Sequence, residues 1–168
     1  MASPLRSLAL AAMAMLSGCA TMSGAGAGRG LPDFSLPDTS GDVVQLSSFT
    51  GKDVVYLDFW ATWCGPCGVE MPQLERLYDT YKARGFVVIG ISMDDPSTQG
   101  SVASYVHRNG LGFPVVIDTD SRATNLYNPT RSAPYGVLID RTGKIVEEHT
   151  GYTPGDEVPL EAKIRELL

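Results

Sequence analysis

The stretch 58–67, DFWATWCGPC, decides the fold of this 168-residue chain. It overlaps the end of an apolar run, 54–61 (VVYLDFWA), which is typical of a strand buried on both faces of a sheet. The residues that follow, 65–82, repeat apolar side chains at helical spacing and predict an amphipathic helix. Two cysteines, separated by two residues, therefore stand where a buried strand turns into a helix.

This position gives the two cysteines different properties. Cys64 falls at the predicted helix N-terminus, where unpaired backbone N–H groups and the helix dipole favour a thiolate and lower the thiol pKa. Pro66 in the first turn costs no helical hydrogen bond. We expect Cys67 to face inward with Met71, and Cys64 to face solvent beside Trp63. The pair predicts a redox disulfide in which Cys64 forms the mixed disulfide and Cys67 resolves it.

Strand and helix patterns alternate along the rest of the chain. They predict strands at 43–46, 86–93, 114–117, 135–139 and 144–148, and helices at 99–108, 121–127 and 157–168. The last two strands flank the turn sequence DRTG and form a hairpin, so the sheet is expected to be mixed. The order predicts an α/β fold, a three-layer α/β/α sandwich with extra N-terminal β elements.

The stretch 58–67 resembles the active-site segment of thioredoxins, and residues 31–168 resemble the TlpA-like thiol-disulfide oxidoreductases, which carry a redoxin domain. Further matching features are LPDF at 31–34, Glu70 and Pro72 after the second cysteine, Phe113-Pro114, and Ala133-Pro134 before LIDRTG. The resemblance implies a thioredoxin-like fold and a redox-active Cys64–Cys67 disulfide, with no other cofactor and no metal.

Two acidic residues are candidate proton acceptors for Cys67. Asp58 matches the buried aspartate of thioredoxins, and Glu70 matches a glutamate near the active site of TlpA-like proteins. The alternatives are an Asp58 carboxylate hydrogen-bonded to backbone, and a Glu70 side chain that is solvated in the first helical turn. Thioredoxins pair the aspartate with a lysine in the next strand, but residues 86–95 contain none. We therefore expect burial to raise the pKa of Asp58.

The resemblance also indicates where substrate binds. Pro134 matches the cis-proline that faces the active site in this fold, where neighbouring backbone can pair with an extended peptide. Ala133 stands where the family often has threonine. Together with Trp63, Gly65 and Pro66, these residues are the predicted substrate-binding surface.

The N-terminal residues predict export and a lipid anchor. Residues 1–18 contain Arg6 followed by the apolar run LALAAMAML and are typical of a signal peptide. The sequence LSGC at 16–19 resembles the lipobox of bacterial lipoproteins, so Cys19 is the predicted lipidation site. Residues 19–30 then form a glycine-rich tether to the domain at 31–168. The alternative is an ordinary secretory peptide with an incidental cysteine.

These features predict a lipid-anchored enzyme of the bacterial periplasm or cell envelope. A Gly-Pro pair between the cysteines matches reducing thioredoxins, so we expect it to reduce disulfides of exported proteins with electrons from a membrane thiol donor. Apocytochrome thiols awaiting haem are one candidate target, which would support cytochrome c maturation. The chain has 13 basic and 19 acidic residues, a net charge of −6, which argues against nucleic-acid binding. We expect a monomer.

Two other functions fit parts of the sequence. A thiol peroxidase of the peroxiredoxin type would need a threonine three residues before its cysteine, after a proline, but Thr62 lies only two residues before Cys64. A Cu(I)-handling protein could use both cysteines, with Met71 and Met93 as additional soft ligands.

Overall fold

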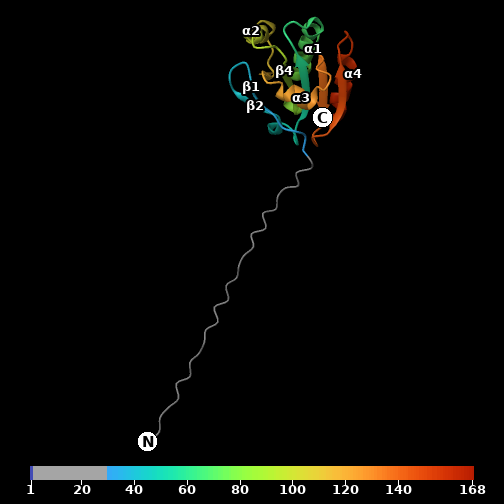
Figure 1. Ribbon diagram of the computed structural model, residues 1–168. Coiled ribbons are helices and arrows are strands. Elements are labelled where there is room, and N and C mark those ends of the chain that lie inside the picture. The colour runs from blue at the N-terminus through green and yellow to red at the C-terminus, as the bar shows by residue number, and fades with distance from the viewer. Residues whose placement is uncertain (2–29) are drawn as a thin grey trace.

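The computed structural model describes Met1 and residues 30–168 (Figure 1). The predicted signal peptide after Met1, the Cys19 lipidation site and the tether up to residue 29 lie outside the described residues. Within residues 30–168 no helix is long and apolar enough to cross a membrane.

The elements follow the predicted alternation of strands and helices. The strands are β1 (Ser35–Pro37), β2 (Val43–Gln45), β3 (Val54–Trp60), β4 (Phe86–Ser92), β5 (Val115–Ile117), β6 (Tyr135–Ile139) and β7 (Ile145–Thr150). The α-helices are α1 (Gly65–Tyr81), α2 (Gln99–Asn109), α3 (Arg122–Tyr127) and α4 (Glu157–Leu167), with short 3-10 helices η1 (Leu46–Ser48) and η2 (Lys82–Arg84).

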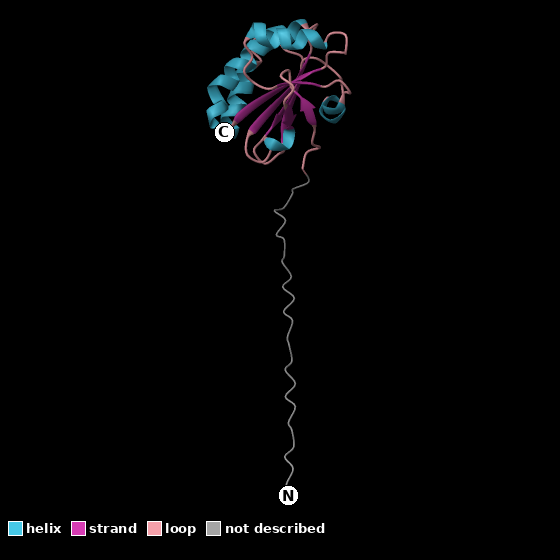
Figure 2. Ribbon diagram, turned by 90° about the vertical axis from the view of Figure 1, so that its left-hand side faces the viewer, coloured by secondary structure: helices cyan, strands magenta, loops and turns pink. Residues whose placement is uncertain are grey.

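The central sheet has five strands in the order β5-β4-β3-β6-β7. Strands β3, β4 and β5 are parallel, whereas β6 runs antiparallel to both β3 and β7. Figure 2 shows these strands side by side with helices on both sides of the sheet. The predicted mixed sheet and its late hairpin are therefore confirmed.

Alternate residues of β3 enter two separate cores, because successive side chains of a strand point to opposite faces. Tyr56 and Trp60 pack with buried residues of α1, α2 and α4. Leu57 and Phe59 pack on the other face with residues of α3 and of the N-terminal strands. The fold is thus the predicted three-layer sandwich, and β3 is its fully buried centre.

The N-terminal segment contains a strand that periodicity did not reveal. Strand β1 pairs antiparallel with β2, with Leu36 opposite Val44, and together they form the expected extra β elements. The predicted strand 43–46 ends one residue early, because Leu46 begins η1 and is itself buried. A three-residue strand is too short for alternation to show in the sequence.

Candidate active site

The cysteine pair lies where the sequence predicts it, at the first turn of α1. Cys64 is the N-cap residue and forms a disulfide with Cys67. The backbone N–H of Cys67 donates a hydrogen bond to Cys64 Sγ at 3.2 Å. A sulfur in this position receives the N–H groups that a helix N-terminus leaves unpaired, which favours a thiolate once the disulfide opens.

The exposures of the residues around the disulfide correct one expectation. Cys67 faces inward and is 1% exposed, as predicted. Cys64 is only 7% exposed, so the prediction that it faces solvent is wrong. Its sulfur is bonded to the inward-facing Cys67, and the neighbouring Trp63 takes the outer position with 64% exposure. Gly65 and Pro66, which lie between the two cysteines in sequence, are also exposed. The protein surface beside the disulfide is therefore formed by Trp63, Gly65 and Pro66.

Asp58 is buried within β3 without a hydrogen bond. It is 1% exposed, and neither carboxylate oxygen has a partner. Its neighbours in register are two glycines, Gly90 on β4 and Gly136 on β6. Burial raises the pKa of Asp58 to about 7, in the predicted direction, because desolvation disfavours the charged form. The alternative of a carboxylate held by backbone hydrogen bonds is therefore wrong.

The glycines beside Asp58 make room for two aromatic side chains. A Cβ on Gly136 would lie 1.9 Å from Tyr56 Oη, so only glycine allows the hydroxyl to stand there. A Cβ on Gly90 would lie 3.3 Å from Trp60 Nε1, a buried N–H without a hydrogen-bond acceptor. Trp60 is a fully buried core residue, and Asp58 on β3 lies between the two glycines in the row of paired strands.

Glu70 is the second acid beside the disulfide. It follows Cys67 by one helical turn, is 3% exposed, and its Oε2 has no hydrogen-bond partner. The alternative of a solvated first-turn acid is therefore wrong. Burial and then the nearby Asp58 carboxylate raise the pKa of Glu70 to about 9, while the Tyr56 hydroxyl acts in the opposite direction. Two such carboxyl groups hold at least one proton near neutral pH, because both cannot ionise cheaply.

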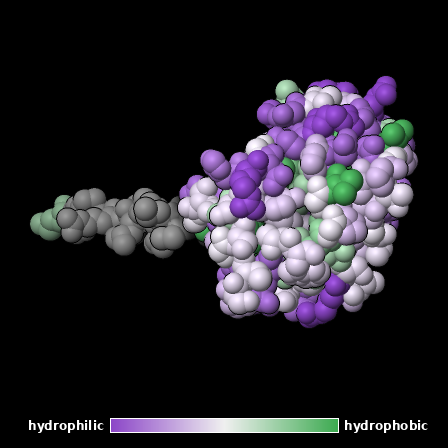
Figure 3. Space-filling model, turned by 90° about the horizontal axis from the view of Figure 1, so that it is seen from above, coloured by the Kyte–Doolittle hydropathy of each residue, from purple (hydrophilic) through white to green (hydrophobic). Residues whose placement is uncertain are grey.

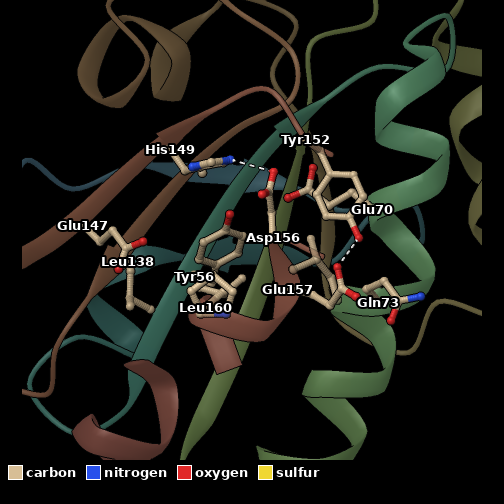
Figure 4. A pocket seen from close by; sticks show the side chains of 13 residues that line it. Tyr56, Glu70, Gln73, Leu138, Glu147, His149, Tyr152, Asp156, Glu157 and Leu160 are labelled. Atoms are coloured by element: carbon tan, nitrogen blue, oxygen red, sulfur yellow. Dashed lines mark hydrogen bonds and ion pairs between the residues drawn. The ribbon is translucent and has the colours of Figure 1, made fainter. Parts of the chain in front are cut away.

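A cavity of about 60 Å³ opens next to Glu70 (Figure 4). It lies between α1, the β6–β7 hairpin and the start of α4, and sequence reasoning did not predict it. Its polar lining consists of Tyr56, Glu70, Gln73, Glu147, His149, Tyr152, Asp156 and Glu157. The residues are scattered over almost the entire domain, so no local motif reveals the cavity.

The predicted cis-proline is present. The Ala133–Pro134 peptide bond is cis, and Pro134 is buried immediately before β6. Ala133 packs against the core cluster that contains Cys64 and Cys67.

The exposed surface of the domain has few large apolar side chains. Figure 3 shows a face that is mainly polar, with small, separate hydrophobic groups. Trp63 and Val69, at 64% and 50% exposure, flank the cysteine pair in sequence and are the exposed apolar residues of this site.

Two of the residues invoked for the alternative functions, Thr62 and Met93, are engaged elsewhere. Thr62 donates its backbone N–H and its hydroxyl to Asp94, at 2.9 and 2.5 Å. Met93 packs in the core on the other face of the sheet from the cysteines, and its Sδ accepts a hydrogen bond from Asn128 at 3.6 Å. Met71 alone shares the cysteine core.

Known proteins are similar to this chain in sequence and in fold. The sequence profile of the AhpC/TSA family matches residues 27–148. The chain belongs to this family. Relatives named thiol-disulfide oxidoreductase ResA, from Geobacillus kaustophilus and Halalkalibacterium halodurans, are 37% and 39% identical over 131 and 125 residues. These matches cover 78% and 74% of this chain, and 73% and 69% of the relatives.

A solved structure from Chlorobium tepidum, described as thiol:disulfide interchange protein DsbE, is 38% identical to this AhpC/TSA family member. The TM-score is 0.75, and the match covers 82% of this chain and 94% of that one. Together with the disulfide at the N-terminus of α1, these similarities establish that this chain is a thiol-disulfide oxidoreductase with a redoxin domain.

Proposed function

We propose that this oxidoreductase reduces disulfides of exported proteins at the cell envelope, with Cys64 as the attacking sulfur. The observation that carries the proposal is the Cys64–Cys67 pair at the start of α1, backed by two buried carboxyl groups, three of whose oxygens have no hydrogen-bond partner. The site supplies a stabilised thiolate on one side and proton acceptors on the other. No metal or cofactor beyond the disulfide takes part in the proposed steps.

In the first step the Cys64 thiolate attacks a substrate disulfide. A sulfur–sulfur bond forms between Cys64 and one substrate sulfur, and the other substrate sulfur leaves as a thiolate that takes a proton from water. The helix N-terminus stabilises Cys64 in the reduced protein, so the attacking form is populated near neutral pH.

In the second step Cys67 resolves the mixed disulfide. Its buried thiol must lose a proton first, and the carboxylate of Glu70 or Asp58 accepts it. The Cys67 thiolate then attacks Cys64 Sγ, the second substrate thiolate leaves, and the protein is oxidised to the disulfide seen in the structure. A thiol donor on the membrane must return two electrons before the next cycle.

The surface around the disulfide supports binding of an extended substrate segment. Trp63, Gly65 and Pro66 are exposed beside the cysteines, and Ala133 packs against the core cluster that contains both cysteines. We assign these four residues, together with Pro134, to substrate binding. Apocytochrome c, which must present reduced thiols to haem, is one client class with this chemistry, and other exported disulfide proteins are a second.

We further propose that the chain is made with a signal peptide and reaches the envelope as a lipoprotein. Lipidation at Cys19 would leave the domain on a tether of about a dozen residues beside its membrane donor. Replacing Cys19 with serine should release the protein from the membrane fraction. A wild-type protein found only in the soluble fraction would contradict the anchor without affecting the proposed chemistry.

Insulin reduction and a redox titration test the proposed activity. With dithiothreitol as electron source, the protein should reduce the disulfides of insulin, and the reduced insulin precipitates. In Cys64→Ser we expect the rate to fall by about a thousandfold or more, to the uncatalysed rate. In a redox titration followed by the fluorescence of Trp60 and Trp63, we expect a reduction potential closer to about −270 mV, as in thioredoxin, than to about −120 mV, as in a strong oxidant. A value above about −150 mV would reverse the proposed direction.

A further inference from the structure

The wall of the cavity opposite Glu70 contains His149, which the two-step exchange reaction does not use. His149 on β7 is in register with Gly136 on β6, and Gly136 is in register with Asp58 on β3. Residues directly opposite one another in a sheet project from the same face. Asp58 and His149 therefore lie on one face, two strands and roughly 10 Å apart.

The space between these two residues is occupied by a hydroxyl group. Gly136 has no side chain, and Tyr56 Oη stands where a Cβ on that glycine would be, 1.9 Å from the ideal position. Across the sheet, the Asp58 carboxyl group, the Tyr56 hydroxyl and the His149 imidazole therefore follow one another in a row. Figure 4 shows the Tyr56 hydroxyl, the Asp156 carboxylate and the His149 ring directed into the same space.

The His149 ring reaches both the cavity and the solvent. Its Nε2 atom is buried and makes no hydrogen bond, although the side chain as a whole is 43% exposed. Nε2 lies 3.4 Å from Oδ2 of Asp156, an ion-pair separation when the ring is protonated. An imidazole in this position can take up a proton at one nitrogen and release one from the other.

We propose that His149, oriented by Asp156, carries protons between the buried carboxyl groups and solvent during thiol exchange. This inference rests on the proposed role of Glu70 and Asp58 as proton acceptors for Cys67. Neither cysteine is among the residues that line the cavity with His149, so we assign His149 the role of a relay and not of the primary base.

The charges around the ring favour such a relay. The titratable groups that line the cavity with His149 are Tyr56 on β3, Glu70 on α1, Glu147 on β7, Tyr152 in the following loop, and Asp156 and Glu157 at the start of α4. Neither lysine nor arginine is among the described residues that form this lining. Glu157 accepts hydrogen bonds from the Tyr152 hydroxyl and Gly155 N–H. Asp156 Oδ2 accepts the Thr153 N–H at 2.8 Å, which holds this carboxylate beside the ring.

The proposed step transfers one proton per turnover. Near neutral pH the Glu70 carboxyl group holds a proton, which first passes through water in the cavity to His149 Nε2 while the Nδ1 proton leaves to solvent. The Glu70 carboxylate then takes the Cys67 proton. The cavity of about 60 Å³ can hold a few water molecules. An acid with a pKa raised to about 9 releases its proton to neutral water slowly, so an intervening base accelerates its return to the charged form.

Proton rescue by a small base tests the relay in the purified full-length protein. His149→Gln keeps a polar side chain of similar size but does not titrate, and His107→Gln on α2 is the matched control. Oxidation of the reduced protein by excess oxidised glutathione is followed through tryptophan fluorescence from pH 5 to 8. In dilute, non-imidazole buffer we expect His149→Gln to be about tenfold slower than wild type.

Added imidazole should restore the rate of His149→Gln and leave wild type and His107→Gln unchanged. A wild-type rate for His149→Gln in dilute buffer would overturn the relay, and so would a slow rate that imidazole does not rescue. Glu70→Gln separates the two proposals: if it retains the wild-type rate and pH profile, the assigned proton acceptor fails. If Glu70→Gln is slow while His149→Gln is normal, only the relay fails.

Discussion

Four buried carboxylates of this small domain divide into two kinds. Asp94 and Asp118 are 2% and 4% exposed, and each accepts three hydrogen bonds. Asp58 and Glu70 are 1% and 3% exposed, yet both Asp58 oxygens and Glu70 Oε2 accept none. Burial is nearly equal, so the difference lies in the partners.

The partners show what each kind of carboxylate does. Asp118 accepts the backbone N–H groups of Ala123 and Thr124 at 3.1 and 2.8 Å, together with the Thr124 hydroxyl, and so fixes the first turn of α3. Asp94 holds the loop before the cysteines through Thr62. A buried carboxylate without donors is costly to charge and ready to take a proton, which a thiol-exchange site requires.

Removing both unpartnered carboxylates should have the largest effect on activity. The double variant Asp58→Asn/Glu70→Gln leaves Cys67 without a proton acceptor, and general base catalysis contributes about 100- to 10,000-fold. We expect resolution of the mixed disulfide to slow by at least about 100-fold, measured by quenched-flow trapping of the Cys64 adduct. Asp118→Asn, on the other side of the comparison, should keep the wild-type rate under conditions where it is folded. Equal rates in all three proteins would remove both acids from the mechanism.

The pH dependence of stability should distinguish the same two acids. The folded protein holds the Asp58 and Glu70 protons up to pH values of about 7 and about 9, whereas the ordinary pKa values are 3.8 and 4.5. Because the unfolded chain loses these protons first, the free energy of unfolding of the oxidised protein should fall as pH rises from about 4 to about 9. Asp58→Asn should remove about 2–4 kcal/mol of this fall in urea titrations. The exposed Asp42→Asn serves as control and should keep the wild-type slope.

Removing a partnered carboxylate should instead reduce stability. Asp118→Ala leaves the buried Ala123 and Thr124 N–H groups and the Thr124 hydroxyl without their acceptor. Lost hydrogen bonds to a charged group predict a decrease of about 2–3 kcal/mol in the free energy of unfolding at pH 7. Asp58→Asn should not lower stability at that pH. A larger loss from Asp58→Asn than from Asp118→Ala would invert the assignment of structural and chemical roles.

The sequence predicted the local part of this site well. The helix N-terminus, Cys64 as cap, the inward Cys67, and the acids at 58 and 70 all lie within thirteen residues, where spacing along one strand and one helix fixes their relation. The prediction that Cys64 is exposed was wrong because a disulfide to a buried partner draws the sulfur inward. Helical spacing describes the faces of a helix, and the cap residue lies just outside it.

The cavity could not be predicted from the sequence because it depends on strand register. Asp58, Gly136 and His149 form one row only after β3, β6 and β7 pair, and they are separated by 78 and 13 positions. Nothing in the local pattern around His149 distinguishes it from an exposed histidine in a hairpin. Asp94 and Asp118 were missed for a similar reason, since the donors that satisfy Asp94 lie up to 32 positions away.

A substitution at Gly136 tests whether the row formed by Asp58, the Tyr56 hydroxyl and His149 exists. Of the substitutions predicted here, we expect Gly136→Ala to have the smallest effect. A Cβ there would lie 1.9 Å from Tyr56 Oη and 2.5 Å from Cζ, so the Tyr56 ring must move. Overpacking of this kind predicts a loss of about 1–3 kcal/mol for Gly136→Ala in urea unfolding. In Gly68→Ala a Cβ meets only Tyr105 Oη at 3.6 Å, so this control should be neutral or slightly stabilising.

The Tyr56→Phe background separates the hydroxyl from the ring in this prediction. Removing the hydroxyl relieves the 1.9 Å approach but not the 2.5 Å approach to Cζ, so Gly136→Ala should cost less there without becoming neutral. The two substitutions should therefore couple in a double-mutant cycle, as expected for side chains in contact. Additive effects would show that the hydroxyl does not occupy the space above Gly136, and the row from Asp58 to His149 would then have no bridging group.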